Sequence, residues 1–141
     1  MNDESKAVEE VAKATGKAID ATREFGGFIA KYAGHSLEQA MGLVEDKFRY
    51  MRWERQVRLV ERAAAFLKER GLPAPSRTVP LQVMIPLIQA GSIEEDDWMQ
   101  DRWAALLVNA ADASIDTEVR RAFVSILEGL SAFEAHLQIR L

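Results

Sequence analysis

Residues 47–58 read KFRYMRWERQVR, and the buried side of the chain changes within this stretch. The apolar residues up to this point share one helix face, made of Leu37, Met41, Val44, Phe48 and Met51. Those that follow share another, made of Trp53, Val57, Val60, Ala64 and Leu67. A helix buries the face that carries its apolar residues. We therefore predict one long helix over 37–70 whose two halves pack against different partners.

Basic side chains alternate with aromatic rings in the same stretch, a composition typical of nucleic-acid binding. On a helix, however, Arg55, Arg58 and Arg62 form a stripe roughly opposite the apolar residues that begin with Trp53. Base stacking needs rings and cations on one exposed surface, so this separation weakens the interpretation. Three alternatives stay open for the basic stripe. It is solvated or paired within the fold, or it contacts a protein, or it contacts nucleic acid or anionic lipid.

Helical spacing of apolar residues extends over almost the whole chain, and no segment alternates like a strand. The sequence predicts an all-α fold of about six helices, in which two long N-terminal helices precede a compact bundle of shorter ones. The expected helices cover about 4–33, 37–70, 80–90, 93–112, 116–128 and 132–141. We expect one domain, 1–141, with a long-helix half at 1–71, a linker loop at 72–78 and a compact half at 79–141.

A repeated pattern predicts three helix junctions: a glycine, then a serine, then Glu or Gln three residues after the serine. Glycine suits the left-handed end of a helix, and the serine caps the next helix while the longer side chain reaches back. The pattern occurs at Gly34, Ser36 and Gln39, at Gly91, Ser92 and Glu95, and at Gly129, Ser131 and Glu134. A fourth helix end is expected at Gly71-Leu72-Pro73, and Pro86 should kink the helix that contains it.

The first predicted helix carries a heptad-like apolar stripe, made of Val8, Val11, Thr15, Ala18, Thr22, Phe25, Ile29 and Tyr32. Small residues also recur at every fourth position from Thr22 to Gly34, which lets another helix approach closely. Charges at Arg23, Glu24 and Lys31 favour packing within a soluble fold over contact with a membrane. A stripe of this kind is also typical of self-association.

Composition places the chain among soluble globular proteins, with 48% apolar and 28% charged residues. The net charge of −4 opposes nucleic-acid binding except by a local patch. The absence of cysteine excludes a disulfide framework, a thiolate metal site and a cysteine nucleophile. The acidic N-terminus does not resemble a secretory signal, and no apolar run is long enough to span a membrane. We expect a cytoplasmic protein, with peripheral membrane association as the alternative.

No residue set indicates catalysis, a metal site, a cofactor or a small-molecule substrate. The acidic run 94–97 is explained by the first turn of a helix, where the macrodipole favours negative charge. His35 and His136 lack further ligands at metal spacing and are interpreted as structural or surface residues. Trp103 lies on an apolar face and is predicted to be core, whereas Trp98 lies off that face and would cover a neighbouring helix or anchor an interface.

Two segments together resemble one known family. VPLQVMIPLIQAGSIEEDDWMQDRWAALLVNAADA (79–113) and AFVSILEGLSAFEAHLQIRL (122–141) are similar to the Abi-alpha (abortive infection alpha) family, strongly over about the last 65 residues. The matching positions are Pro86, Ser92, Glu94, Glu95, Trp103, Ala104, Leu106, Leu107, Asn109, Phe123, Leu130, Ser131 and Glu134. Caps and core packing explain all of these except Asn109, which would bond a nearby loop or line a recognition surface.

The resemblance implies bacterial defence against phage and brings no catalytic residue with it. We expect a non-enzymatic helical protein that acts through protein–protein contacts, as a homo-oligomer or with a protein partner. The alternative is a nucleic-acid or anionic-membrane binder that uses the basic helix 47–62. The candidate interaction surface comprises Arg55, Arg58, Arg62, Trp98 and Asn109.

Overall fold

The computed structural model describes residues 3–116, together with 122, 125 and 129, and within them the fold is all-α, as predicted. Its five helices are α1 (Asp3–Ala33), α2 (Leu37–Lys47), α3 (Trp53–Glu69), α4 (Leu81–Ile93) and α5 (Asp97–Ala111), and no strand occurs in this part of the chain. The helices predicted at 116–128 and 132–141 fall largely or wholly outside the described residues, as do Ser131, Glu134 and His136, so of the junction predicted at Gly129 only the glycine itself is described.

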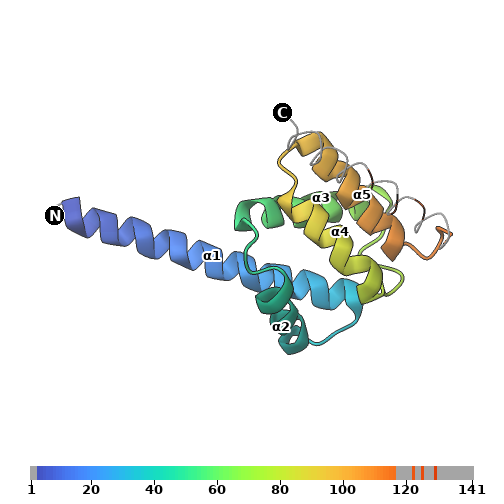
Figure 1. The fold of residues 1–141 in the computed structure, drawn as a ribbon, viewed down its shortest axis with the longest axis horizontal. Helices are drawn as coiled ribbons and strands as arrows, with labels where there is room; N and C mark the ends of the chain where they lie inside the picture. The colour runs from blue at the N-terminus through green and yellow to red at the C-terminus, as the bar shows by residue number, and fades with distance from the viewer. Residues whose placement is uncertain (1–2, 117–121, 123–124, 126–128, 130–141) are drawn as a thin grey trace.

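Helices α3, α4 and α5 pack on one another to form the body, and the second half of α1 lies against α2 and α3 (Figure 1). The first half of α1 extends away from the body on its own. Large side chains from every helix but α2 fill the core, and the most deeply buried include Trp103, Phe25, Ile29, Leu59 and Ile88. Phe48, just after α2, closes the core beside α1, where its ring meets that of Phe25 edge-on at 5.5 Å between centroids.

The prediction of one helix over 37–70 is wrong, because the chain breaks at 48–52 between α2 and α3. The break falls where the apolar face changes: Phe48 turns into the core at 2% exposure instead of continuing the helix. The backbone group exposed by the break is satisfied from within, because the buried amide of Gln56 donates to the carbonyl of Phe48 at 3.3 Å. Changing the buried face thus ends one helix and starts another.

The buried line of α3 also differs from the predicted stripe. Its buried residues are Gln56, Leu59, Ala63 and Leu67, so only Leu67 of the expected set is buried. Val57 and Val60 are half-buried and Ala64 is exposed. The reason is that α3 contacts three helices, α1, α4 and α5, so the residues it buries depend on how these neighbours pack around it.

Two of the predicted helix ends are confirmed. Ser36 caps α2 in a capping box with Gln39, after Gly34 takes a left-handed φ of 73°. Gly71 has a φ of 72° just after α3. The junction predicted at Gly91 and Ser92 is wrong: both residues are buried inside α4, and Asp96 caps α5 by accepting from the Met99 amide at 2.8 Å.

Gly91 serves close packing instead of ending a helix. A Cβ at this position would lie 3.0 Å from Leu59 Cδ1 and 3.1 Å from Trp103 Cβ. Because both neighbours belong to the core and are 1% exposed, neither has room to withdraw. The missing side chain at Gly91 lets α4 approach α3 and α5 closely.

The prediction for this contact is that Gly91→Val lowers the free energy of unfolding by about 1–3 kcal/mol through overpacking. The matched control is Gly42→Val in α2, where an added Cβ meets nothing within 4 Å. Urea denaturation followed by far-UV circular dichroism measures both. A Gly91→Val protein as stable as the Gly42→Val protein would contradict the account.

Candidate interaction surfaces

The basic stripe of α3 lies against the acidic side of α5, and together they form what we call the charged seam. Arg55 Nη1 lies 2.8 Å from Asp97 Oδ1, and its Nε donates to the carbonyl of Glu94 at 2.8 Å. Arg58 lies 3.0 Å from Asp101 and 3.4 Å from Asp97, measured from its Nη2 and Nε. The seam forms because both helices run in the same direction with matching spacing of opposite charges.

The same seam continues along α3. Arg62 Nε donates to Asp101 Oδ1 at 3.0 Å, so Asp101 lies between two guanidinium groups. At the far end, Arg70 pairs with Asp112 at 3.1 Å and also donates to the side-chain oxygen of Asn109. Opposite charges therefore meet along most of the length of the α3–α5 contact.

A buried amide stands at the centre of this contact. Gln100 is fully buried, and its Nε2 donates both to the carbonyl of Arg55 at 2.9 Å and to that of Gly91 at 2.8 Å. Its Oε1 accepts from Arg58 Nη1 at 2.8 Å. One side chain of α5 thus hydrogen-bonds α3 and α4 at once, and its hydrogen-bonding groups are satisfied, as a buried amide requires.

The pKa of one carboxyl group is lowered at each end of the seam. A hydrogen bond from Arg55 is the main reason that the pKa of Asp97 falls below its usual value, and the charges of Arg58 and Arg55 add to it. The pKa of Asp112 is lowered mainly by hydrogen bonds from the Ser114 hydroxyl and amide, and then by Arg70. Ionised carboxylates at these positions therefore favour the folded state.

Of the candidate residues, Arg55, Arg58 and Arg62 are brought together, but by partners within the fold. Their side chains are 14%, 27% and 37% exposed, and each contacts at least one carboxylate of α5. Of the alternatives that the sequence left open, the structure shows pairing of these arginines within the fold. The sequence analysis missed Asp101 and Gln100 as partners because their alignment with α3 depends on how the helices pack.

Asn109 and Trp98 lie apart from the three arginines. Asn109 is half-buried at the end of α5, where it accepts from Arg70. Trp98, at the start of α5, is 64% exposed, with the guanidinium of Arg102 4.8 Å above its ring. Ile93, five residues earlier at the end of α4, is 66% exposed. Trp103, in contrast, is core as predicted, at 1% exposure.

A second exposed apolar surface lies on the first half of α1. Val8, Val11 and Ile19 are 69%, 65% and 58% exposed. We call residues 3–20 the arm. All of them are exposed except Ala18, which is half-buried. Val8 and Val11 lie one helical turn apart and Ile19 lies about two turns further along, and we call this side of the arm the apolar strip. Exposed apolar side chains gathered on one side of a helix can mark an interaction site.

A groove of about 520 Å³ lies between α1 and α3. Its apolar lining includes Phe28, Tyr32 and Val60, and Lys31 and Lys68 stand among its lining residues. Burial raises the pKa of the Tyr32 hydroxyl above its usual range. That hydroxyl has no hydrogen-bond partner among the described residues.

In the described part of the chain, no group of three or more His, Asp or Glu side chains is placed to hold a metal ion. The Nδ1 atom of His35 lies 3.4 Å from Gln39 Oε1, within the cap of α2. No helix among the described residues has the length and apolar character needed to cross a membrane.

The helical body formed by α3, α4 and α5 is matched by a known family. The model of the family described as abortive infection alpha matches residues 54–137, which is more than half of the chain. The chain belongs to the abortive infection alpha family. No curated protein and no solved structure matches it. The match begins at the start of α3, so the helices of the charged seam lie inside it and α1 and α2 precede it.

One prediction concerns the buried amide. Gln100→Met keeps the approximate volume but leaves two carbonyl groups and Arg58 without a buried partner. The free energy of unfolding should fall by about 2–4 kcal/mol, because unsatisfied buried groups are costly. Gln82→Met, at an exposed position of α4, is the matched control and should change stability by less than about 0.5 kcal/mol. Equal stability of the two proteins in urea would contradict the role of Gln100.

A second prediction concerns acid. Because the folded-state pKa of Asp112 lies below its usual value of 3.8, its contribution to stability is present above 3.8 and is lost as the pH falls through the lowered pKa. Asp112→Asn should therefore make stability fall less steeply on acidification, and so should Ser114→Ala, which removes the main cause of the shift. Urea midpoints measured from neutral pH to about pH 3 follow the slope.

The control for acid dependence is Ser76→Ala. Ser76 Oγ accepts from the Ala113 amide at 2.9 Å and donates to the Ala111 carbonyl at 3.4 Å, and both of these partners are backbone groups. Its removal should lower stability by the same amount at every pH. An unchanged acid slope in both Asp112→Asn and Ser114→Ala would contradict the assignment.

Proposed function

We propose that this protein acts in phage defence by binding another protein chain through exposed apolar surfaces, with no catalysis of its own. Membership of the abortive infection alpha family supports the defence role. The observation that carries the mode of action is the arm, whose Val8, Val11 and Ile19 lie in solvent. Exposure of these side chains is unfavourable, and covering them with a partner removes apolar surface from water.

The arm is also poorly explained as a helix that stands alone. Most of the stability of a protein helix comes from packing its apolar face, and an isolated helix of this length is marginal in water. The arm spans about 27 Å at 1.5 Å per residue, and its residues before Ala18 are all exposed. A partner that packs against the apolar strip would supply the missing stabilisation.

Binding to nucleic acid or to an anionic membrane is the weaker alternative. A phosphate group approaching Arg55, Arg58 or Arg62 would have to displace Asp97 and Asp101, which lie within 3.4 Å of these guanidinium groups. The net charge of −4 adds a general repulsion. The charges of α3 thus serve the contact with α5 and leave the apolar surfaces as the better binding sites.

Trp98 is proposed as a second contact. Tryptophan is enriched among the residues that dominate binding energy, and this one is 64% exposed. Asn109 is less suited to this role because it already accepts from Arg70. We place the protein in the cytoplasm, in keeping with its lack of cysteine.

The experiment is a plaque assay in a phage-sensitive bacterial host that expresses the full chain, tested against a panel of phages. The unmodified protein should lower plaque numbers, and Val11→Glu should abolish protection because it places a charge in the apolar strip. Lys13→Glu adds the same side chain to the opposite face of the arm and should leave protection intact. Full protection by Val11→Glu, at equal protein level, would overturn the proposed use of the arm.

A further inference from the structure

The apolar face of the arm is the same face that α1 later buries in the body. Val11, Ala18 and Phe25 are each separated by seven residues, which brings them to nearly the same side of the helix. Phe25 and Ile29 are 1% exposed on that side, whereas Val11 is 65% exposed. The same side of α1 is thus buried against the body in the second half of the helix. In the first half, no described residue covers it.

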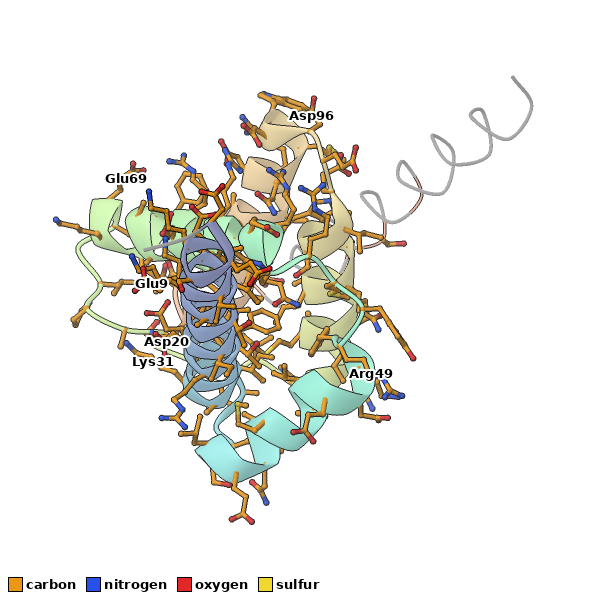
Figure 2. The ribbon with its side chains drawn as sticks, turned by 90° about the vertical axis from the view of Figure 1, so that its left-hand side faces the viewer. Glu9, Asp20, Lys31, Arg49, Glu69 and Asp96 are labelled. Carbon is orange, nitrogen blue, oxygen red and sulfur yellow. The ribbon has the colours of Figure 1, made fainter. Side chains whose placement is uncertain are left out.

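Most charged residues of the arm lie away from this strip, and only Glu4, seven residues before Val11, falls on the same side of the helix. Lys6, Glu9, Lys13 and Asp20 fall on the half of the helix away from Val11 and Ala18. Figure 2 views the molecule from the free end of α1 and shows Glu9, Asp20 and Lys31 on one side of the helix. The arm is therefore amphipathic, with a single face suited to packing.

We propose that the arm of one molecule packs antiparallel against the arm of a second copy of this chain, with the two-fold axis close to Lys13. This inference rests on the proposed function, because it names the partner of the same surface. The orientation, the register and the flanking charges each support it independently.

The orientation follows from the shared face. In a parallel pair in register, the second half of the partner's α1 would run along the side where Phe25 and Ile29 already pack on the body. Those positions are occupied, so the two bodies would collide. In an antiparallel pair, the free end of the second copy's arm points toward the body of the first molecule. The body of the second copy then lies beyond the N-terminus of the first molecule, so the two bodies do not collide.

The register of the pair follows from the position along α1 at which the body begins to bury the helix. Ala21 and Phe25 are buried, so the partner's arm must end near Thr22. With the axis near Lys13, Val8 lies opposite Ala18 of the second copy and Val11 lies opposite Thr15 of the second copy. Each large aliphatic residue then meets a small one, which allows close approach of the two helices.

The flanking charges distinguish the two orientations. Asp3, Glu10 and Lys17 are seven residues apart and border one edge of the strip, while Ala12 and Ile19 border the other. A parallel pair would place the charged edge beside the apolar edge. An antiparallel pair places the charged edge beside itself, with Glu10 level with Lys17 of the second copy, and this pairing occurs twice by symmetry.

A groove lies where the free end of the second copy's arm would pack. This groove of about 280 Å³ lies along α1 and reaches α2 at one residue; it is lined by Thr15, Ala18, Ile19, Thr22 and Arg23 of α1 and by Met41 of α2. Met41 is half-buried there. The first turn of the second copy's arm reaches this groove in the proposed register and covers Met41, so the antiparallel pair ends against α2.

The first experiment measures mass by size-exclusion chromatography with light scattering on the full chain. The unmodified protein should be a dimer. Val11→Glu should weaken dimerisation by about a hundredfold or more, because it buries an unpaired charge, and Lys13→Glu should not. Glu10→Lys or Lys17→Glu alone should weaken the dimer, and the double exchange should restore it. A monomeric unmodified protein, or a double exchange weaker than either single one, would overturn the proposal.

The second experiment fixes the orientation. Because the chain has no cysteine, single cysteines report one contact each. Val8→Cys mixed with Ala18→Cys should form a disulfide-linked dimer under mild oxidation, and neither protein alone should. A parallel pair would instead link two Val8→Cys chains or two Ala18→Cys chains, with no linkage between the two variants. That result would overturn the proposal.

Failure of this inference and failure of the proposed function give different results. If the purified chain is monomeric but Val11→Glu still abolishes phage protection, the arm binds a different protein and only the self-pairing is wrong. If the chain dimerises as proposed but Val11→Glu protects fully, the pairing stands and its role in defence is wrong.

Discussion

The structure depends on the buried amide of Gln100. From α5 it hydrogen-bonds the backbone of α3 and that of α4, and it accepts from Arg58. A buried amide that bonds three groups fixes how those helices meet, because any other arrangement leaves polar groups unpaired in the core. Gly91 takes part in the same helix contact. Its carbonyl accepts from Gln100, and its missing side chain leaves room for Leu59 and Trp103.

Once Gln100 sets the alignment of α3 and α5, the charged residues of the two helices meet in order. Arg55 and Asp97 stand at one end, and Arg70 and Asp112 at the other. Exposed pairs of this kind add little stability singly, so the value of the seam lies more in fixing alignment than in strength. The seam pairs Arg55, Arg58 and Arg62, three of the cations of α3, with carboxylates of α5.

The family match and the arm divide the chain in a way that fits this account. The match starts at the beginning of α3 and covers the helices aligned by Gln100. The arm precedes it, attached through the second half of α1, which covers the body with Phe25 and Ile29. A rigid body with a projecting amphipathic helix suits a protein that works by assembly, and the proposed antiparallel pairing would hold two such bodies at opposite ends of a short two-helix rod.

By itself the sequence determined the all-α fold, the family, the cap at Ser36 and the core position of Trp103, because these follow from local spacing and local hydrogen bonds. It also located the point near Phe48 where the buried face changes, but not that the helix breaks there. Only the tertiary structure decided that break, the burial of Gly91 and Ser92 inside α4, and the pairing of Arg55, Arg58 and Arg62 with α5. Each of these depends on contacts between different helices, and helical periodicity reports only the faces of one helix, so it carries no information about which neighbour will cover them.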